Sequence, residues 1–201
     1  LKQGVRYVLT TPAVRTLILM AVVTELFGWA HEPMLAVMAR DVLAIGASGL
    51  GFLMAGASAG GLISTVVVAN LGNVKEKGLM LVGGFAGFGF FLIAFAWSPW
   101  FPLSLVMLGL AYASVTAYEA SLNTLLQTIV PNKMRGRVLS FQTFTWAFTG
   151  LSGFHTGAIA SAAGAPLAIS IGGVVVLLNA LRLARRMYGF PAQQFEATSG
   201  E

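Results

Sequence analysis

The sequence contains no cysteine and little charge. Of its 201 residues, only 9% are charged, whereas soluble globular domains have about 25%. The absence of cysteine excludes a disulfide framework and any thiolate metal site. Hydrophobic residues make up 57% of the chain, and its mean hydropathy is +0.81. So few charges could not keep the surface of a soluble fold hydrated, so we expect most apolar side chains to face a lipid bilayer.

Catalytic and metal-binding patterns are also missing. The two histidines and the scattered glutamates do not share metal-ligand spacing with a third ligand, so we expect no metal and no cofactor. No nucleophile lies near a suitable base, which argues against an enzyme. The net charge of +5 could suggest a nucleic-acid partner. The basic residues, however, form short clusters between apolar stretches, as in cytoplasmic membrane loops, so we expect no nucleic acid.

Six apolar stretches are each about long enough to cross the roughly 30 Å hydrocarbon core as a helix. They cover approximately residues 14–37, 48–69, 79–97, 103–129, 138–160 and 166–183. The sequence therefore predicts an all-α membrane protein, with a six-helix transmembrane bundle over residues 14–186. We expect a cytoplasmic linker over residues 1–13 and a flexible cytoplasmic tail over residues 187–201.

The basic residues predict the orientation. With the N-terminus in the cytoplasm, only Arg40 of the twelve Lys and Arg residues falls outside. Positive charge is retained on the cytoplasmic side during insertion, so both ends of this multi-pass segment are expected inside the cell, in the inner (plasma) membrane. The cytoplasmic residues are then Lys2, Arg6, Arg15, Lys75, Lys77, Lys133, Arg135, Arg137, Arg182, Arg185 and Arg186.

Two glutamates are predicted near the bilayer midplane. Glu25 lies eleven residues after Val14, roughly 16 Å from the cytoplasmic end, and Glu119 lies ten residues before Ile129, roughly 15 Å from the same face. A charge at this depth costs about 2.5–3.5 kcal/mol, so it is retained only beside a cavity or a partner. The pair indicates proton coupling or recognition of a cationic substrate. The alternative is a structural carboxyl group hydrogen-bonded to a neighbouring helix.

Polar side chains recur at helical spacing on three of the predicted helices. On the first two we interpret them as faces of a substrate and proton site. On the third, interhelical packing is the favoured interpretation. Trp29, Tyr112 and Trp146 are the expected aromatic contacts for a substrate. The three sets are Glu25, Gly28 and Glu32; Tyr112, Thr116, Glu119 and Asn123; and Gln142, Thr145, Thr149, Ser152 and Thr156.

The cluster His31-Glu32-Pro33 predicts a break in the first helix, because proline cannot donate to the carbonyl of Trp29. A gate is one interpretation of this cluster, and a solvated helix end is the other. His155 is expected to be an interhelical histidine with its hydrogen bonds satisfied. The glycine pairs Gly56–Gly60, Gly83–Gly87 and Gly153–Gly157 have the spacing that allows close helix packing.

Three segments carry a family resemblance. The stretch from Gln127 to Val138 contains Pro131 and Arg135-Gly136-Arg137, and resembles the loop between helices ten and eleven in the major facilitator superfamily. The resemblance is greatest to the branch of enterobactin-exporter-like and macrolide-efflux-like proteins. The opening segments, Gly4 to Val8 and Thr11 to Arg15, resemble the central linker of that branch, and Gly49 to Leu53 resembles the start of its helix eight.

This resemblance implies that the chain is the C-terminal half, helices seven to twelve, of a twelve-helix transporter. It also implies an N-terminal six-helix half as partner and a substrate site between the halves, lined by helices seven and ten. One departure is that the segment from Asn70 to Lys77 keeps Gly72, Lys75 and Lys77 but has no Asp, so no salt-bridge latch is expected there. Arg135 and Arg137 are topology charges or, with Gly136, a latch. Since the chain begins with Leu1 and shows no signal-peptide pattern, we expect it to be a piece of a longer protein.

The favoured function is secondary active export of a small amphipathic compound, such as a drug or siderophore, by alternating access coupled to protons. Its partners are then membrane lipid, the N-terminal half, the substrate and protons. The alternative is a non-transporting membrane scaffold or assembly module, in which the midplane charges are paired and sealed from water. A channel is disfavoured because there is no repeated selectivity motif. Sequence leaves open the substrate, the direction, the coupling ion and the oligomeric state.

Overall fold

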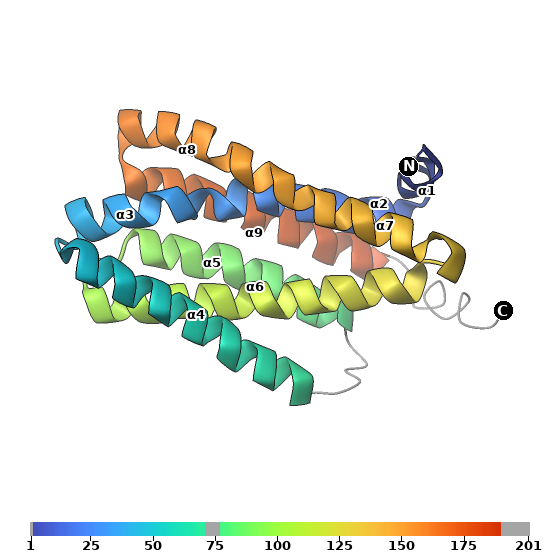
Figure 1. Cartoon of the computed structure of the whole chain (residues 1–201), viewed down its shortest axis with the longest axis horizontal. Helices are drawn as coiled ribbons and strands as arrows, with labels where there is room; N and C mark the ends of the chain where they lie inside the picture. Colours follow the sequence, from blue (N-terminus) through green and yellow to red (C-terminus); the bar gives the residue numbers. More distant parts are fainter. Residues whose placement is uncertain (1, 71–76, 190–201) are drawn as a thin grey trace.

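The computed structural model describes residues 2–70 and 77–189, and this part of the chain is helical without strands (Figure 1). The described elements, in chain order, are α1 (Lys2–Thr10), α2 (Pro12–Val23), η1 (Thr24–Gly28), η2 (Trp29–Met34), α3 (Leu35–Val37), η3 (Met38–Val42), α4 (Gly46–Asn70), α5 (Lys77–Ala96), α6 (Phe101–Ile129), α7 (Asn132–Thr145), η4 (Trp146–Phe148), α8 (Thr149–Ala163) and α9 (Ala165–Gly189).

Five helical stretches of the described chain are long and apolar enough to cross a membrane. They confirm five of the six predicted spans and make this a multi-pass membrane protein. The predicted span at 138–160 is also helical, through α7, η4 and α8, but is too polar to meet the same criterion. The five stretches are Pro12–Val42, Gly46–Asn70, Lys77–Ala96, Phe101–Ile129 and Ala165–Arg185.

The polar helix formed by α7, η4 and α8 turns its polar side inward. Thr145 and Thr156 are each 1% exposed, whereas Phe154 is 78% exposed. Polar groups inside a bundle and apolar groups outside are the arrangement that a lipid environment favours. The low hydropathy of this helix therefore comes from residues that avoid lipid. Gln142 and Ser152 are likewise buried, and Phe144, Trp146 and Leu151 are exposed.

Glycines set the closest helix contact, between α4 and α6. A Cβ added at Gly60 would overlap the backbone carbonyl of Gly109, and one added at Gly109 would lie 3.2 Å from the carbonyl oxygen of Gly56. The two backbones therefore touch without intervening side chains, as the predicted Gly56–Gly60 pair requires. This confirms the packing interpretation for that pair.

The other two glycine pairs behave differently. Gly87 does pack on α6, because a Cβ there would lie 2.7 Å from Ser114 Oγ, but Gly83 faces open space. Its neighbour Gly84 makes the second contact, with a Cβ position 2.8 Å from the Cβ of Tyr118. Gly153–Gly157 has no atom within contact distance of either Cβ position, so the prediction of tight packing is wrong for that pair in the described chain.

The segment that resembles an interhelical loop is mostly helical. Helix α6 ends at Ile129, and α7 already begins at Asn132, so Arg135, Gly136 and Arg137 lie in the first turns of α7. The prediction that they form a loop is wrong. Pro131 explains the tight connection, because its carbonyl accepts hydrogen bonds from the backbone N–H groups of Met134 and Arg135 at 2.9 and 3.0 Å.

Helices also extend into the predicted linker and tail. Residues 2–10 of the linker form α1, which packs on α7: a Cβ at Gly4 would lie 3.2 Å from the Cβ of Arg137. Helix α9 continues to Gly189, so the first three residues of the predicted tail are helical, and the rest of the tail lies outside the described residues, as do Gly72 and Lys75.

Figure 1 shows α1, the start of α7 and the C-terminal end of α9 at the same end of the bundle, opposite the α8–α9 turn at Gly164.

Candidate functional site

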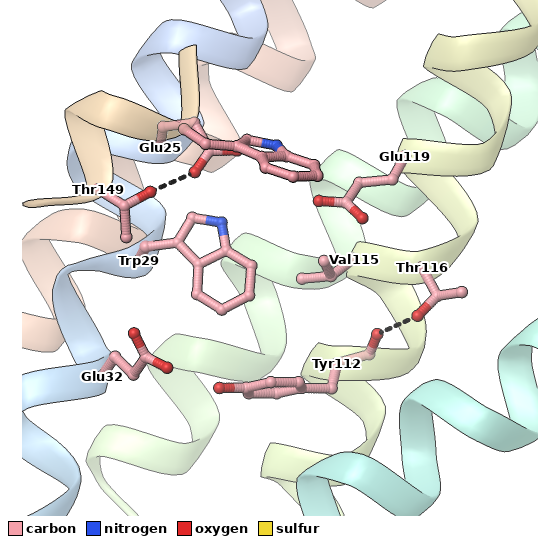
Figure 2. A pocket seen from close by; sticks show the side chains of 9 residues that line it. Glu25, Trp29, Glu32, Tyr112, Val115, Thr116, Glu119 and Thr149 are labelled. Atoms are coloured by element: carbon pink, nitrogen blue, oxygen red, sulfur yellow. Dashed lines mark hydrogen bonds between the residues drawn. The ribbon is translucent and has the colours of Figure 1, made fainter. Parts of the chain in front are cut away.

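A pocket of about 420 Å³ lies between the helices that carry Glu25 and Glu119 (Figure 2). This volume falls within the range of small-molecule sites, about 300–1,000 Å³. Three of its lining residues are acidic, three are aromatic and none is basic. Its nine lining residues are Glu25, Trp29, Glu32, Tyr112, Val115, Thr116, Glu119, Trp146 and Thr149.

The first wall of the pocket is the helical stretch Pro12–Val42, which changes its winding beside the site. Residues Thr24–Gly28 form a π-helical segment, in which the N–H of Trp29 donates to the carbonyl of Thr24. Residues Trp29–Met34 then wind as a 3₁₀ helix with Pro33 inside it, so the predicted break is confirmed. Such irregular turns are common at functional sites. Here they place Glu25, Trp29 and Glu32 on the pocket side.

Glu25 is only 4% exposed, and its Oε2 accepts a hydrogen bond of 2.6 Å from the Thr149 hydroxyl of α8 (Figure 2). Thr149 belonged to the stripe that was interpreted as packing, so sequence reasoning missed this contact. The one sequence feature that could have indicated this contact is the position of Thr149 on the polar stripe of another predicted helix. Which member of the stripe meets Glu25 depends on how the two helices are rotated, and a single sequence does not contain that information.

The second wall is α6, an unbroken helix of 29 residues. Figure 2 shows Glu119 pointing from α6 into the pocket, toward the helix that carries Trp29. Glu25 and Glu119 are close enough to interact electrostatically. The hydroxyl of Thr116 donates to the Tyr112 carbonyl at 3.1 Å, and Asn123 donates through Nδ2 to the Glu119 carbonyl at 3.0 Å. Asn123 is not among the residues that line the pocket.

Aromatic rings pack tightly at the edge of the pocket. Trp29 stacks on His31 with ring centroids 5.8 Å apart, and Tyr112 meets both rings edge-on at 5.8 and 5.7 Å. Phe88 of α5 closes the cluster, 5.9 Å from His31. Edge-to-face and offset contacts of this kind fix ring orientation. Trp29 and Tyr112 are thereby held in place where they line the pocket.

His31 is completely buried, so the interpretation of this segment as a solvated helix end is wrong at that residue. Its Nδ1 lies 2.8 Å from the Gly28 carbonyl, which makes Nδ1–H the donor, and no partner for Nε2 is found in the described chain. The neighbours Glu32 and Pro33 are exposed. Because buried polar atoms normally have partners, the Nε2 atom is a feature that calls for explanation.

Several other buried polar atoms near the pocket also have no partner within the described residues. They include Nε1 of Trp29 and the hydroxyl of Tyr118, which lie close to one another but do not meet hydrogen-bond geometry. His155 was expected to be satisfied, yet its Nε2 also has no partner, and its ring lies 5.1 Å from Phe27. No group of three or more metal-ligating side chains is found in the described chain.

A model of the family described as "Transmembrane secretion effector" matches residues 1–198, nearly the whole chain. The chain belongs to this family. Transmembrane secretion effectors are part of the major facilitator superfamily, so the resemblance to that superfamily is confirmed, and the family is one of transporters and not of enzymes. Comparison with curated proteins gave no match.

In a transmembrane secretion effector, the pocket is a candidate substrate-binding site. Membership of this family implies membrane transport of a small substrate. A cavity with acidic and aromatic lining, between helices that cross the membrane, is the kind of site at which transporters bind their cargo.

Proposed function

We propose that this protein exports a small amphipathic compound, such as a drug or siderophore, by alternating access, with proton exchange at Glu25 and Glu119. The observation that carries the proposal is that both carboxyl groups line one pocket. Sequence reasoning required these two side chains to meet at a shared cavity. Had they faced different sides of the bundle, no common path for protons and substrate would exist.

The physical basis of the coupling is the cost of a charge in a medium of low dielectric. A carboxyl group away from bulk water favours its neutral form, and it ionises when water or a cation reaches it. Thr149 offers Glu25 a hydrogen bond, whereas no side-chain partner is found for the Glu119 carboxyl group in the described residues. We assign Glu119 as the more exchangeable proton carrier and Glu25 as its buried neighbour.

The proposed partner is an N-terminal six-helix half, packed so that the pocket lies between the two halves near the midplane. We propose that both ends of the segment lie on the cytoplasmic side of the inner membrane. This orientation is supported by the charge distribution along the bundle, since the basic residues of α1 and of the start of α7 lie at one end and Arg40 lies in η3, near the other. Retention of positive charge favours that end as the cytoplasmic one.

Two elements are proposed to control access. The 3₁₀ segment that contains His31 and Pro33 is the gate, because it lacks regular α-helical hydrogen bonding beside the pocket. Arg135, Gly136 and Arg137, in the first turns of α7, form the latch at the proposed cytoplasmic end. The proposed substrate contacts are Glu32, Tyr112, Thr116 and Trp29. Asn123 lies one helical turn after Glu119 and donates a hydrogen bond to its backbone carbonyl.

The alternative, a non-transporting scaffold, requires midplane carboxyl groups that are paired and sealed. The bond from Thr149 to Glu25 favours that alternative for one carboxyl group. The position of Glu119 on the lining of a pocket does not. We therefore favour transport.

The test is efflux of a fluorescent dye from cells that carry the complete transporter, with and without a proton gradient. We expect gradient-dependent efflux, and a loss of about tenfold or more in Glu119→Gln, which cannot ionise. Asp41→Asn is the matched control, because Asp41 is an acidic residue of the same span that pairs with Arg40 at the surface. Normal gradient-driven efflux by Glu119→Gln would remove Glu119 from the mechanism.

A further inference from the structure

The pocket combines two features that favour one class of ligand. Its three glutamates, Glu25, Glu32 and Glu119, make it strongly acidic, and its three aromatic residues supply ring faces and edges. In the described chain none of the three carboxyl groups forms an ion pair. The described residues therefore bring three carboxyl groups to the pocket and no cation that could balance them when they ionise.

From this arrangement we infer that the substrate is a lipophilic organic cation, and that an anionic compound is excluded. The inference rests on the proposed function, because it names the substrate class of the same pocket. It narrows that proposal, since an acidic siderophore would have to enter beside three carboxyl groups. A cationic substrate would instead supply the positive charge that the lining of the pocket lacks.

The geometry indicates how the cation is held. Glu25 already accepts a hydrogen bond from Thr149, whereas Glu32 and Glu119 accept none from side chains of the described chain. Figure 2 shows Glu32 and the hydroxyl end of Tyr112 directed toward one another at one side of the pocket, and Glu119 at another, with Trp29 between them. A cation over the Trp29 ring can approach Glu32 or Glu119 without displacing a protein partner.

In the conformation described, the aromatic residues are pre-organised for this role. Packing against His31 and Phe88 holds the ring of Trp29, and Tyr112 packs edge-on against Trp29 and His31. Indole and phenol faces attract cations, and rigid rings lose little entropy when a ligand binds. The volume of about 420 Å³ admits a compound larger than a metal ion or a simple ammonium ion. The class is thus a bulky cation with apolar or aromatic substituents.

The test compares two probes of nearly the same shape and opposite charge. The purified transporter in nanodiscs is titrated with tetraphenylphosphonium or with tetraphenylborate, and binding is followed through tryptophan fluorescence, with protein-free nanodiscs to correct for partition into lipid. We expect the cation to bind at least about tenfold more tightly than the anion. Equal binding, tighter binding of the anion, or no binding of the cation would each overturn the inference.

Variants then locate the site. Glu32→Gln and Glu119→Gln are each expected to weaken cation binding by about tenfold, and Trp29→Leu by about fivefold. Asp41→Asn should bind as wild type does, since Asp41 pairs with Arg40 outside the pocket. Unchanged binding in all three pocket variants would overturn the assignment to this pocket. The wild-type comparison of the two probes stands even if a variant fails to fold.

This experiment separates the inference from the proposed function. Equilibrium binding needs no proton gradient, so selective cation binding without gradient-driven efflux would remove the transport proposal and leave the ligand class standing. Gradient-driven efflux of an anionic compound, without cation binding, would have the reverse effect.

Discussion

Each of the two walls of the pocket carries a glutamate, but one wall is a regular α-helix and the other is irregular. Glu119 stands on α6, which runs as one regular helix from Phe101 to Ile129. Glu25 stands on the stretch Pro12–Val42, which changes from α to π to 3₁₀ winding within a few turns. The difference suggests a fixed wall and an adjustable wall around one site. Motion on one side can then change the environment of both carboxyl groups.

Packing explains the contrast. Helix α6 touches α4 at Gly60 and Gly109, where backbone meets backbone, and it meets Gly84 of α5 at Tyr118. Contacts between backbones leave no side chain that could adjust. The first wall also has close contacts, at Gly172 of α9, where a Cβ would overlap the Phe27 carbonyl, and at Gly28, where a Cβ would lie 2.6 Å from Cε1 of Phe88. Beyond that point it is wound as a 3₁₀ helix, whose hydrogen-bond geometry is poorer than that of an α-helix.

The largest expected effect comes from disturbing the fixed wall. Gly60→Val should destabilise the protein by about 3 kcal/mol, because its Cβ would overlap the Gly109 carbonyl and the two helices would have to separate. The measurement is the apparent melting temperature by size-exclusion chromatography after heating. Gly51→Val on the same helix is the matched control, since no atom lies near its Cβ position. Equal melting temperatures for the two variants would refute the idea of a fixed wall.

A smaller effect is expected where the adjustable wall meets α8. Thr149→Val removes the hydroxyl that donates to Glu25 and should cost about 1 kcal/mol of stability. The control is Thr143→Val on the preceding turns, because the exposed Thr143 hydroxyl bonds only to the Leu139 carbonyl of its own helix. Thermal unfolding of the two variants under the same conditions is the measurement. If Thr143→Val were the more damaging change, the Thr149–Glu25 contact would contribute nothing measurable.

The smallest effect on binding is expected at the proline. Pro33→Ala restores a backbone donor and lets the 3₁₀ segment wind as a regular helix. Because Pro33 does not line the pocket, affinity for tetraphenylphosphonium should change by less than about twofold, while the rate of dye efflux should fall several-fold. Titration and efflux assays on the same preparation measure the two quantities. An unchanged efflux rate would mean that the irregular winding is not used as a gate.

Sequence reasoning located the features that depend on local pattern. The lengths of the apolar stretches predicted five of the spans, and Pro33 predicted the break in the first helix. Counting residues along the predicted helices, at the rise of an α-helix, put Glu25 and Glu119 at similar depth. Those two residues do line one pocket, as that interpretation required.

Features that depend on helix rotation were not predictable. The spacing of Gly153 and Gly157 is the same as that of Gly56 and Gly60, yet only the latter pair faces another helix in the described chain. The partner of Glu25 could not be chosen from a stripe of hydroxyl groups, for the same reason. Rotation about a helix axis is set by tertiary packing, which a single sequence does not encode in readable form.

The account depends most on aqueous access to the pocket, which single introduced cysteines can measure, because these 201 residues contain none of their own and any cysteine elsewhere in the transporter can first be replaced by serine. Cysteines introduced singly at Thr116, which lines the pocket, and at Val106, 54% exposed on the same helix, can be treated with a positively charged, membrane-impermeant thiol reagent. We predict that Thr116→Cys reacts and is protected by tetraphenylphosphonium, while Val106→Cys, which we expect to face lipid, does not react. A Thr116→Cys variant that stays as unreactive as Val106→Cys would contradict the account.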